Sequence, residues 1–263
     1  MKVAIVQMDS GRDKGENLIK AITFVRRAIE KRAEFILLPE VFNYRGPASN
    51  IKSVAEDIPG ESTLPLIELA QKYKVHILAG SIYEKIPKSR KVYNTSVLIG
   101  PRGRREGKYR KMNLFRAAVA GVIFDESKFF LAGQKPAMAK VKNFKLGMSI
   151  CYDLRFPELY RHYALAGAHI LSVPSSFTRP TGRAHFEALL RARAIENLCF
   201  VLAPNQTGKD ARGVLSYGGS MIIDPWGKVL AKASCHEEEV IYADLDKSSL
   251  LKRRKTLPAI LKK

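Results

Sequence analysis

Apolar and polar residues follow strand-like and helix-like patterns in turn along most of this chain. A short apolar run at residues 3–6 predicts a buried strand, and a second run at 35–38 predicts another. Between them, apolar side chains recur at helical spacing from Leu18 to Ile29, which predicts an amphipathic helix over 14–31. The remaining predictions for this half are a helix at 63–74, a strand at 75–80, and a hairpin formed by 82–86 and 92–99.

The second half of the chain repeats this alternation, without a linker, a repeat period or a break in composition. We therefore predict one α/β domain over residues 1–250, with mixed sheets and helices on the outside. Residues 251–263 are predicted to be a basic, poorly packed C-terminal tail, because Pro258 interrupts them. The predicted elements are strands at 144–150, 169–173 and 199–203, helices at 157–166 and 184–197, and a hairpin of 218–223 with 229–231.

Composition places the chain among globular proteins. Hydrophobic residues make up 46% of its 263 residues and charged residues 27%, which excludes general disorder. No apolar run approaches the ~20 residues that a membrane span needs. The first residues lack the long apolar stretch and cleavage pattern of a signal peptide. We expect a soluble, cytoplasmic protein without a membrane partner.

The formal net charge of +20 is concentrated in two segments. Residues 85–116 hold eleven Lys or Arg and one acid, and residues 252–263 hold six basic residues and no acid. The rest of the chain is nearly balanced. Such an excess is typical of proteins that bind nucleic acid, an acidic membrane surface or anionic small molecules. If the 85–116 segment faces an active site, its field would steer an anionic substrate towards it.

The sequence contains no segment that matches a cofactor-binding or metal-binding motif. Residues 103–108 resemble a phosphate-binding loop, but Tyr109 stands where Ser or Thr would bind magnesium. The cluster at 236–239 is typical of a charged, solvated turn rather than of a metal site. The three cysteines are too scattered for a disulfide framework or a zinc site. We predict no organic cofactor and no metal.

Cys151 lies where a predicted strand passes into a predicted helix, with Pro157 suited to the first helical turn. Reacting groups in α/β proteins gather beyond the carboxyl ends of strands, where a thiol is open to activation by positive charge. A cysteine at this point is either a nucleophile or a small buried hydrophobic residue. Its position alone does not choose between them.

A nucleophilic cysteine needs a base and a group that stabilises an oxyanion. Glu40 ends an apolar strand, which favours a functional carboxylate, although a turn or capping role fits the local sequence equally well. Lys111 closes a basic stretch that, taken alone, is more typical of a solvated loop. The histidines that follow Cys151 are weaker candidates, because His162 and His169 flank an apolar segment.

Three blocks of the sequence together resemble the nitrilase, or carbon–nitrogen hydrolase, superfamily. They are Leu38-Pro39-Glu40, Lys108-Tyr109-Arg110-Lys111, and the block from Cys151-Tyr152-Asp153 to Pro157-Glu158, in the order and at the separations of that family. The resemblance extends from Val3 to about Leu245. It favours a catalytic role for Glu40, Lys111 and Cys151 over the non-catalytic roles that the local sequence allowed. Further matching segments are 174–178, 184–187, 190–197, 219–220 and 224–227.

The resemblance implies an αββα sandwich that assembles as a homodimer or a higher homo-oligomer. It also implies that Glu40 is the base, Lys111 the oxyanion-stabilising cation and Cys151 the nucleophile. A second glutamate of the site matches Glu126, and the backbone N–H of Tyr152 matches an oxyanion donor. The implied reaction is hydrolysis of an amide through a thioester, without a metal or cofactor.

The substrate is less well determined by the family than the reaction is. The block after Cys151 most resembles the Nit-type branch, which implies a deaminated glutathione amidase. An omega-amidase acting on α-ketoglutaramate and an N-carbamoyl amino acid hydrolase are the alternatives. Arg155 is either a clamp for a substrate carboxylate or part of an ion pair with Asp153 or Glu158. Thr178, Thr181 and His185 are further candidates for lining the pocket.

Two features qualify this assignment. The family pattern after the lysine is His-Leu-Phe-Asp, whereas this chain has Asn-Leu-Phe-Arg at 113–116, so the local charge of the pocket differs. The basic segments also suit a nucleic-acid-binding protein with a vestigial site. That alternative is disfavoured, because the basic segments contain no RNA-binding motif and no regular alternation of aromatic with basic residues.

Overall fold

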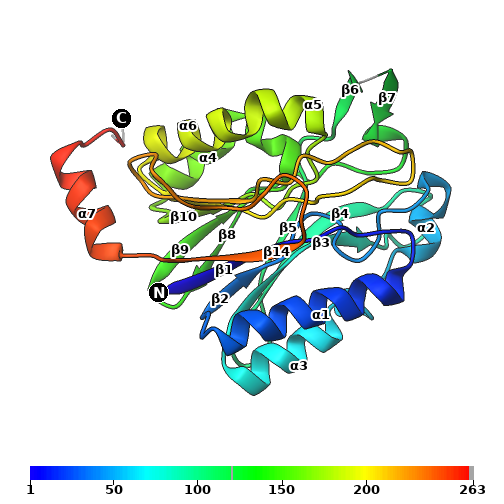
Figure 1. The fold of residues 1–263 in the computed structure, drawn as a ribbon, viewed down its shortest axis with the longest axis horizontal. Coiled ribbons are helices and arrows are strands. Elements are labelled where there is room, and N and C mark those ends of the chain that lie inside the picture. The colour runs from blue at the N-terminus through cyan, green and yellow to red at the C-terminus, as the bar shows by residue number, and fades with distance from the viewer. Residues whose placement is uncertain (120, 261–263) are drawn as a thin grey trace.

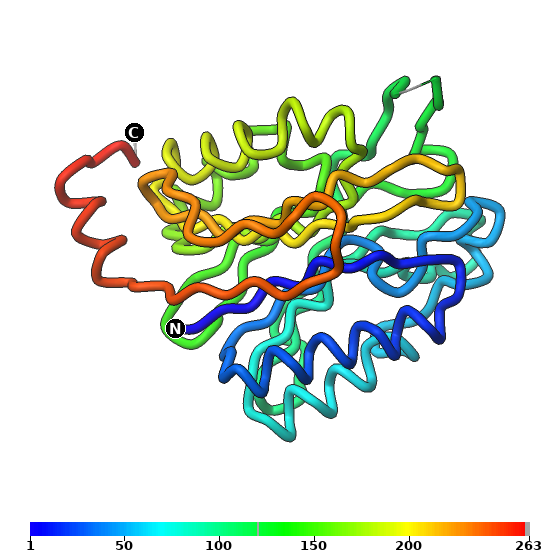
Figure 2. Tube along the Cα trace, in the orientation of Figure 1, coloured from blue at the N-terminus to red at the C-terminus, as the bar shows by residue number. Residues whose placement is uncertain are grey.

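The structure is a computed structural model that describes residues 1–119 and 121–260. In it, sheets and helices are stacked in layers (Figure 1). The tube trace shows the first part of the chain in blue and cyan on one side and the later part in green and yellow on the other (Figure 2). A late strand, drawn in orange, returns to the first side. Throughout the described part of the chain, no helix is long and apolar enough to cross a membrane.

The first sheet has six strands in the order β14-β1-β2-β3-β4-β5. Its three central strands, β1, β2 and β3, run parallel, whereas β14, β4 and β5 pair antiparallel with their neighbours. The strands are β1 (Lys2–Gln7), β2 (Phe35–Leu37), β3 (His76–Glu84), β4 (Tyr93–Ile99), β5 (Arg105–Arg110) and β14 (Glu239–Asp244).

The second sheet has the same plan, in the order β13-β12-β11-β10-β9-β8. Here β9, β10 and β11 run parallel at the centre, and the outer pairings are antiparallel. The strands are β8 (Ala137–Val141), β9 (Phe144–Met148), β10 (Ile170–Ser172), β11 (Phe200–Ala203), β12 (Met221–Ile223) and β13 (Val229–Lys232).

Helices form the two outer layers (Figure 1). The outer face of the first sheet is covered by α1 (Lys14–Glu30) and α3 (Leu64–Tyr73), and that of the second by α4 (Pro157–Leu165) and α6 (Glu187–Asn197). This order of layers confirms the predicted αββα sandwich. The shorter elements are η1 (Ala48–Asn50), α2 (Ile51–Val54), the hairpin β6 (Arg116–Val119) with β7 (Val122–Asp125), η2 (Glu126–Lys128), η3 (Cys151–Arg155), α5 (Arg179–Thr181), the π-helical turn η4 (Gly182–Phe186) and α7 (Lys247–Thr256).

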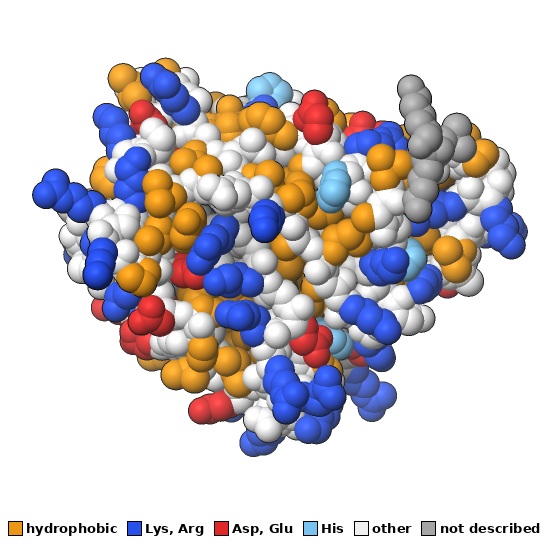
Figure 3. Space-filling model, turned by 180° about the vertical axis from the view of Figure 1, so that it is seen from behind, with side chains coloured by type: hydrophobic (Ala, Val, Ile, Leu, Met, Phe, Trp, Pro, Cys, Tyr) orange, Lys and Arg blue, Asp and Glu red, His pale blue; other side chains and the backbone are white. Residues whose placement is uncertain are grey.

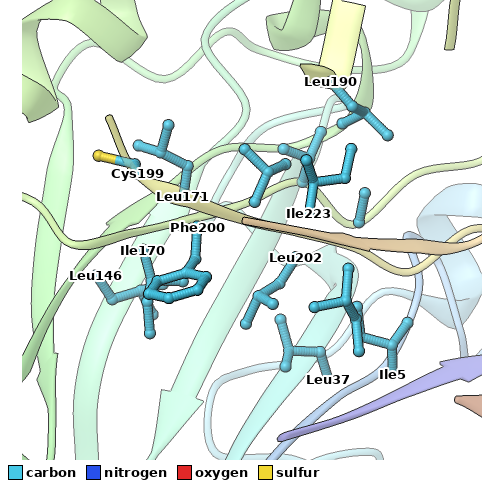
Figure 4. Close-up of a cluster of buried hydrophobic side chains, with 14 of the residues drawn as sticks. Ile5, Leu37, Leu146, Ile170, Leu171, Leu190, Cys199, Phe200, Leu202 and Ile223 are labelled. Atoms are coloured by element: carbon cyan, nitrogen blue, oxygen red, sulfur yellow. The ribbon is translucent and has the colours of Figure 1, made fainter. Parts of the chain in front are cut away.

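Strand periodicity places the apolar side chains of each sheet on two faces. In β1, Val3 and Ile5 belong to the core cluster that joins the sheets, whereas Ala4 and Val6 belong to the cluster under α1 and α3. Figure 4 shows Ile5 and Leu37 of the first sheet near Leu202 of the second. The buried interior therefore continues across the whole sandwich.

The structure corrects the predicted break between residues 80 and 82. The strand predicted at 75–80 and the hairpin strand predicted at 82–86 form one strand, β3. Its pairing with β4 shifts register between Ala79 and Ile82, which marks a bulge or irregularity. Gly80, which suggested the end of a strand, therefore lies inside one.

The predicted basic tail is helical up to Thr256, although most of its side chains are exposed. These residues form α7, which Asp246 caps by accepting hydrogen bonds from the N–H groups of Ser248 and Ser249. Leu250 is fully buried, and Arg254 donates hydrogen bonds to the carbonyl of Leu198. The predicted boundary at residue 250 falls inside this helix, and residues 261–263 lie outside the described part.

Candidate active site

The four predicted catalytic side chains line a single cavity of about 380 Å³. Each comes shortly after a strand: Glu40 after β2, Lys111 after β5, Glu126 after β7 and Cys151 after β9. Because β2 and β9 are central parallel strands of their sheets, their carboxyl ends deliver Glu40 and Cys151 to the same end of the sandwich. The fold therefore brings together residues that are up to 111 positions apart in the sequence.

Lys111 is buried between two carboxylates. Its Nζ lies 3.0 Å from Oε1 of Glu40 and 2.9 Å from Oε1 of Glu126. Burial alone would lower the pKa of Lys111, but the charges of Glu126 and Glu40 outweigh it and hold this pKa well above its ordinary value. The Lys111 backbone is fixed on both sides, by Asn94 O at 2.8 Å and Gly133 N at 2.8 Å. The site therefore holds a permanent, immobile positive charge.

Cys151 begins the 3₁₀ helix η3 with a φ of 50°, in the left-handed region that residues with side chains rarely adopt. Its N–H donates to the carbonyl of Pro174 at 2.9 Å. Burial and then the negative charge of Glu40 raise the pKa of the Cys151 thiol well above its ordinary value, while Lys111 acts in the opposite direction. The raised pKa favours the protonated thiol at rest, and a base is needed to form the thiolate.

Glu126 is held mainly by the backbone of Phe115. Its Oε2 accepts from Phe115 N at 2.7 Å, and its own N–H donates to Phe115 O at 2.9 Å. Burial raises the pKa of Glu126; the charge of Lys111 lowers it and that of Glu40 raises it. The carboxylate thus spans the gap between the Lys111 ammonium and the segment that leads into β6.

Tyr152 is the second residue of η3 and lines the cavity. Its N–H belongs to the first turn of that helix, where N–H groups have no acceptor within the helix. The Tyr152 ring packs at 5.0 Å from the ring of Phe115 and at 5.6 Å from that of Phe156. The N–H that follows Cys151 is therefore held next to the thiol, and its role as an oxyanion donor stays a prediction.

Arg155 lines the cavity without an acidic partner among the described residues. The alternative ion pair with Asp153 or Glu158 is absent from that part of the chain. The guanidinium lies over the rings of Tyr152 and Phe177, at 5.8 and 5.6 Å from their centroids. Its charge is therefore available to an anion that enters the cavity.

The other predicted substrate-binding residues differ in their placement. Thr178 and Thr181 line the cavity, and their hydroxyls lie 2.8 Å apart. His185 does not line it, but its Nδ1 lies 3.4 Å from both terminal nitrogens of Arg155. His185 therefore contacts the side chain of Arg155 rather than the cavity itself.

Sequence reasoning missed several polar residues of the cavity, among them Asn94, Tyr83 and Arg45. Asn94 donates from Nδ2 to Oε1 of Glu40 at 2.9 Å, and Tyr83 lies directly opposite Asn94 on the neighbouring strand β3. Arg45 is buried, with its guanidinium 2.8 Å from Oγ of Ser216. An asparagine within the apolar run of β4 was an available signal, whereas nothing local distinguished Arg45.

The basic segment 85–116 largely points away from the cavity. Of its charged residues within the described ranges, Lys111 alone lines it. Lys108 and Arg110 instead bind the carboxylate of Glu84, each at 2.8 Å. The segment therefore does not supply the steering field expected of it if it faced the site.

Lys and Arg side chains are also spread over the face of the molecule that Figure 3 shows, where they outnumber Asp and Glu.

Glu40 and Glu126 are arranged around the Lys111 ammonium rather than around each other. Glu40 and Glu126 both bind the ammonium of Lys111. Nowhere in residues 1–119 and 121–260 do three or more His, Cys, Asp or Glu side chains gather as a metal site would require. The arrangement suits proton transfer to and from a thiol.

Comparison with known proteins decides the family. The model of the carbon-nitrogen hydrolase family matches residues 2–255. This chain is a carbon–nitrogen hydrolase. The match confirms the predicted family and the predicted reaction class, hydrolysis of a carbon–nitrogen bond.

Relatives of this carbon–nitrogen hydrolase are similar over their whole length. It is 37% identical over 263 residues to the omega-amidase NIT2 of Homo sapiens, covering 100% of this chain and 94% of the relative. It is 39% identical over 261 residues to a deaminated glutathione amidase of Synechocystis sp., covering 98% and 96%.

Solved structures agree with the fold. Saccharomyces cerevisiae Nit3, a member of branch 10 of the nitrilase superfamily, superposes with a TM-score of 0.88 at 34% identity, covering 98% of this chain and 94% of Nit3. The C. elegans NitFhit protein superposes with a TM-score of 0.90 at 37% identity, covering 98% of this chain and 63% of NitFhit.

Proposed function

We propose that this carbon–nitrogen hydrolase is a cysteine-dependent amidase that hydrolyses the side-chain amide of a small, carboxylate-bearing α-keto acid and releases ammonia or the amine attached there. The supporting observation is a buried Cys151 beside Glu40 and Lys111, in a cavity where Arg155 has no acidic partner among the described residues. The relatives named omega-amidase and deaminated glutathione amidase support an amide as the substrate.

The first half of the proposed reaction forms a thioester. Glu40 takes the proton from Cys151, which is needed because the pKa of that thiol is raised. The thiolate then attacks the amide carbon, and the resulting oxyanion is met by the Lys111 ammonium and the Tyr152 N–H. Removing one such donor typically lowers the rate by about 10²- to 10³-fold. Glu40 returns its proton to the amide nitrogen as the carbon–nitrogen bond breaks, and the amine leaves, as ammonia from α-ketoglutaramate or as cysteinylglycine from deaminated glutathione.

The second half hydrolyses the thioester. A water molecule takes the place of the departed amine and gives a proton to Glu40, and its oxygen attacks the thioester carbon. The carbon–sulfur bond then breaks, a carboxylic acid leaves, and the proton on Glu40 restores the Cys151 thiol. Glu126 orients Lys111 throughout, since its carboxylate is held by the backbone of Phe115.

Deaminated glutathione is the proposed substrate, and α-ketoglutaramate is the second candidate. The two share an α-keto acid with a terminal amide or amide-linked chain, but the first is the size of a tripeptide. A cavity of about 380 Å³ lies within the range of small-molecule sites and leaves space beyond a five-carbon acid. The similarity to omega-amidases favours the smaller acid. N-carbamoyl amino acids remain the third class to be tested.

Hydrolysis by the purified protein tests the proposal. The panel contains deaminated glutathione, α-ketoglutaramate, an N-carbamoyl amino acid and a simple nitrile; release of cysteinylglycine is measured for the first and release of ammonia for the other three. We expect turnover of the first two, abolished by Cys151→Ala and retained by Cys235→Ala, because Cys235 is exposed and lies outside the cavity. Activity that survives Cys151→Ala, or a wild-type protein that hydrolyses none of the four, contradicts the proposal.

The proposal also includes a homodimer or a higher homo-oligomer that works in the cytoplasm. The family resemblance supports the assembly. Light scattering coupled to size-exclusion chromatography measures the first, and fractionation of the source cells measures the second. A monomer across the working concentration range contradicts the assembly.

A further inference from the structure

Asp153 is a fully buried carboxylate that the reaction does not use, two residues after Cys151. Four donors converge on it. Oδ2 accepts from Ile150 N at 2.9 Å and from the Tyr109 hydroxyl at 2.8 Å. Oδ1 accepts from the backbone N and the side-chain Nδ2 of Asn113, each at 2.9 Å. The two oxygens therefore face different parts of the chain, one of them next to the nucleophile.

These four bonds define the charge state of Asp153. An ionised carboxylate offers about four acceptor sites and no donor, and all four partners here are donors. A protonated carboxyl would present an O–H to groups that have only N–H or O–H to offer. Burial, followed by the charge of Asp153, raises the pKa of Tyr109, which stays a neutral hydroxyl donor. Burial raises the pKa of Asp153, whereas the hydrogen bonds from Ile150, Tyr109 and Asn113 act in the opposite direction and favour the ionised form.

The donors come from the two segments that carry the proposed nucleophile and the proposed oxyanion-stabilising cation. Ile150 immediately precedes Cys151, whereas Tyr109 and Asn113 lie two residues to either side of Lys111. The Tyr109 hydroxyl also accepts from Met112 N at 3.3 Å. One carboxylate thus ties the turn at Cys151 to the backbone on both sides of Lys111.

Stable hydrogen bonds are needed next to Cys151 because its backbone has a positive φ of 50°. Residues with side chains in the left-handed region persist only where surrounding contacts determine their conformation. The bond from Ile150 N to Asp153 fixes the residue before the strained one. The bonds to Tyr109 and Asn113 fix the distance of that turn from the lysine segment.

We propose that Asp153 is a positioning residue, which holds the Cys151 thiol in register with the Lys111 ammonium by binding the backbone segments of both. This inference rests on the proposed function, because it assigns Cys151 and Lys111 their parts in the reaction. Asp153 touches neither the substrate nor the reacting atoms. Loosening its network moves the thiol relative to the oxyanion-stabilising charge and slows bond formation more than it weakens binding.

The test uses Tyr109→Phe and Asn113→Ala, each of which removes one donor from the Asp153 network and leaves the carboxylate in place. Tyr163→Phe is the matched control. Tyr163 is fully buried in the same core cluster, but its hydroxyl binds Met148 O at 2.6 Å and Ala137 N at 3.1 Å instead. All variants are made in a Cys235→Ala background, so that alkylation of the native protein by iodoacetamide reports on Cys151, because the remaining cysteine, Cys199, is fully buried.

We expect Tyr109→Phe and Asn113→Ala each to lower kcat about tenfold, with KM within about twofold. Asp153→Asn, which turns an N–H towards donors, lowers kcat by about 10²-fold if the variant folds. Adding Tyr109→Phe to Asp153→Asn causes no further loss, because the shared interaction is already broken. The rate of Cys151 alkylation falls in Tyr109→Phe and is unchanged in Tyr163→Phe.

Two results overturn the inference. An unchanged kcat and alkylation rate in Tyr109→Phe shows that the network does not position the thiol. Equal losses in Tyr109→Phe and Tyr163→Phe, in proportion to their melting temperatures, show that any buried hydroxyl of this core has the same effect. A wild-type protein without amidase activity refutes the proposed function instead, and the alkylation rates then decide alone whether Asp153 controls Cys151.

Discussion

Substituting Gly80 by alanine is expected to displace the catalytic base without touching it. Gly80 lies in β3 against the segment that leads to Glu40, and a Cβ added there would lie 1.9 Å from the carbonyl oxygen of Pro39. Real Cβ contacts are essentially never below 3.0 Å, so the carbonyl must retreat by about 1.1 Å. Pro39 is bonded directly to Glu40, and the shift is therefore passed to the carboxylate that receives the thiol proton.

A misplacement of about 1 Å in a catalytic group typically costs about 10²-fold in rate. We expect Gly80→Ala to lower kcat for deaminated glutathione by that factor, with a loss of about 1–3 kcal/mol in stability from overpacking. Release of cysteinylglycine measures the first and denaturant unfolding the second. Gly11→Ala is the control, because a Cβ at Gly11 meets nothing within 4 Å. A Gly80→Ala protein with kcat within threefold of wild type would refute the link between this contact and Glu40.

Three further predictions concern charge. Burial raises the pKa of Glu84, but its bonds to Arg110 and Lys108 outweigh this effect and lower the pKa to about 2. Glu84→Gln should therefore lower the free energy of unfolding by about 2 kcal/mol at pH 7, after allowance for the partly exposed partners. The difference in stability between this variant and the wild type, measured by urea unfolding, should fade as the pH falls from 4.5 to 2. Cys151 alkylation should still rise beyond pH 9, because the thiol pKa is raised, and a plateau below that pH contradicts the assignment. Arg155→Ala should raise KM at least tenfold with little change in kcat; the reverse pattern removes Arg155 from carboxylate binding.

Local patterns predicted the strands and helices, whereas the layer order and the four cavity residues came from the resemblance to the nitrilase superfamily. Apolar runs with strand or helix periodicity specify which face of each element is buried, and this gave one α/β domain with helices on the outside. Glu40 and Cys151 each follow a strand, but that position alone left other roles open, and the three sequence blocks together selected them. Their roles in the reaction stay predictions until the variants are measured.

The features that sequence patterns missed depend on contacts between distant segments. The segment predicted as a tail forms helix α7 up to Thr256. Its Arg254 binds the carbonyl of Leu198, which follows α6, and no local sequence pattern predicts this distant contact. Asn94 is recognisable as part of the site only once Glu40 is seen to accept its hydrogen bond. In β3, the bulge lets Gly80 continue a strand that its residue type suggested had ended.

The charges of the cavity provide a means to tell an amide from a carboxylate, which have nearly the same shape. Around Cys151, two carboxylates oppose the single ammonium of Lys111, so the catalytic end carries excess negative charge. A like-charge pair 4 Å apart near a protein surface costs about 4 kcal/mol. In the proposed reaction the substrate carboxylate is therefore directed to Arg155, and the uncharged amide is left to meet the thiol. Hydrolysis then creates a new carboxylate between Glu40 and Glu126, and the repulsion that excluded the wrong end of the substrate favours release of the product.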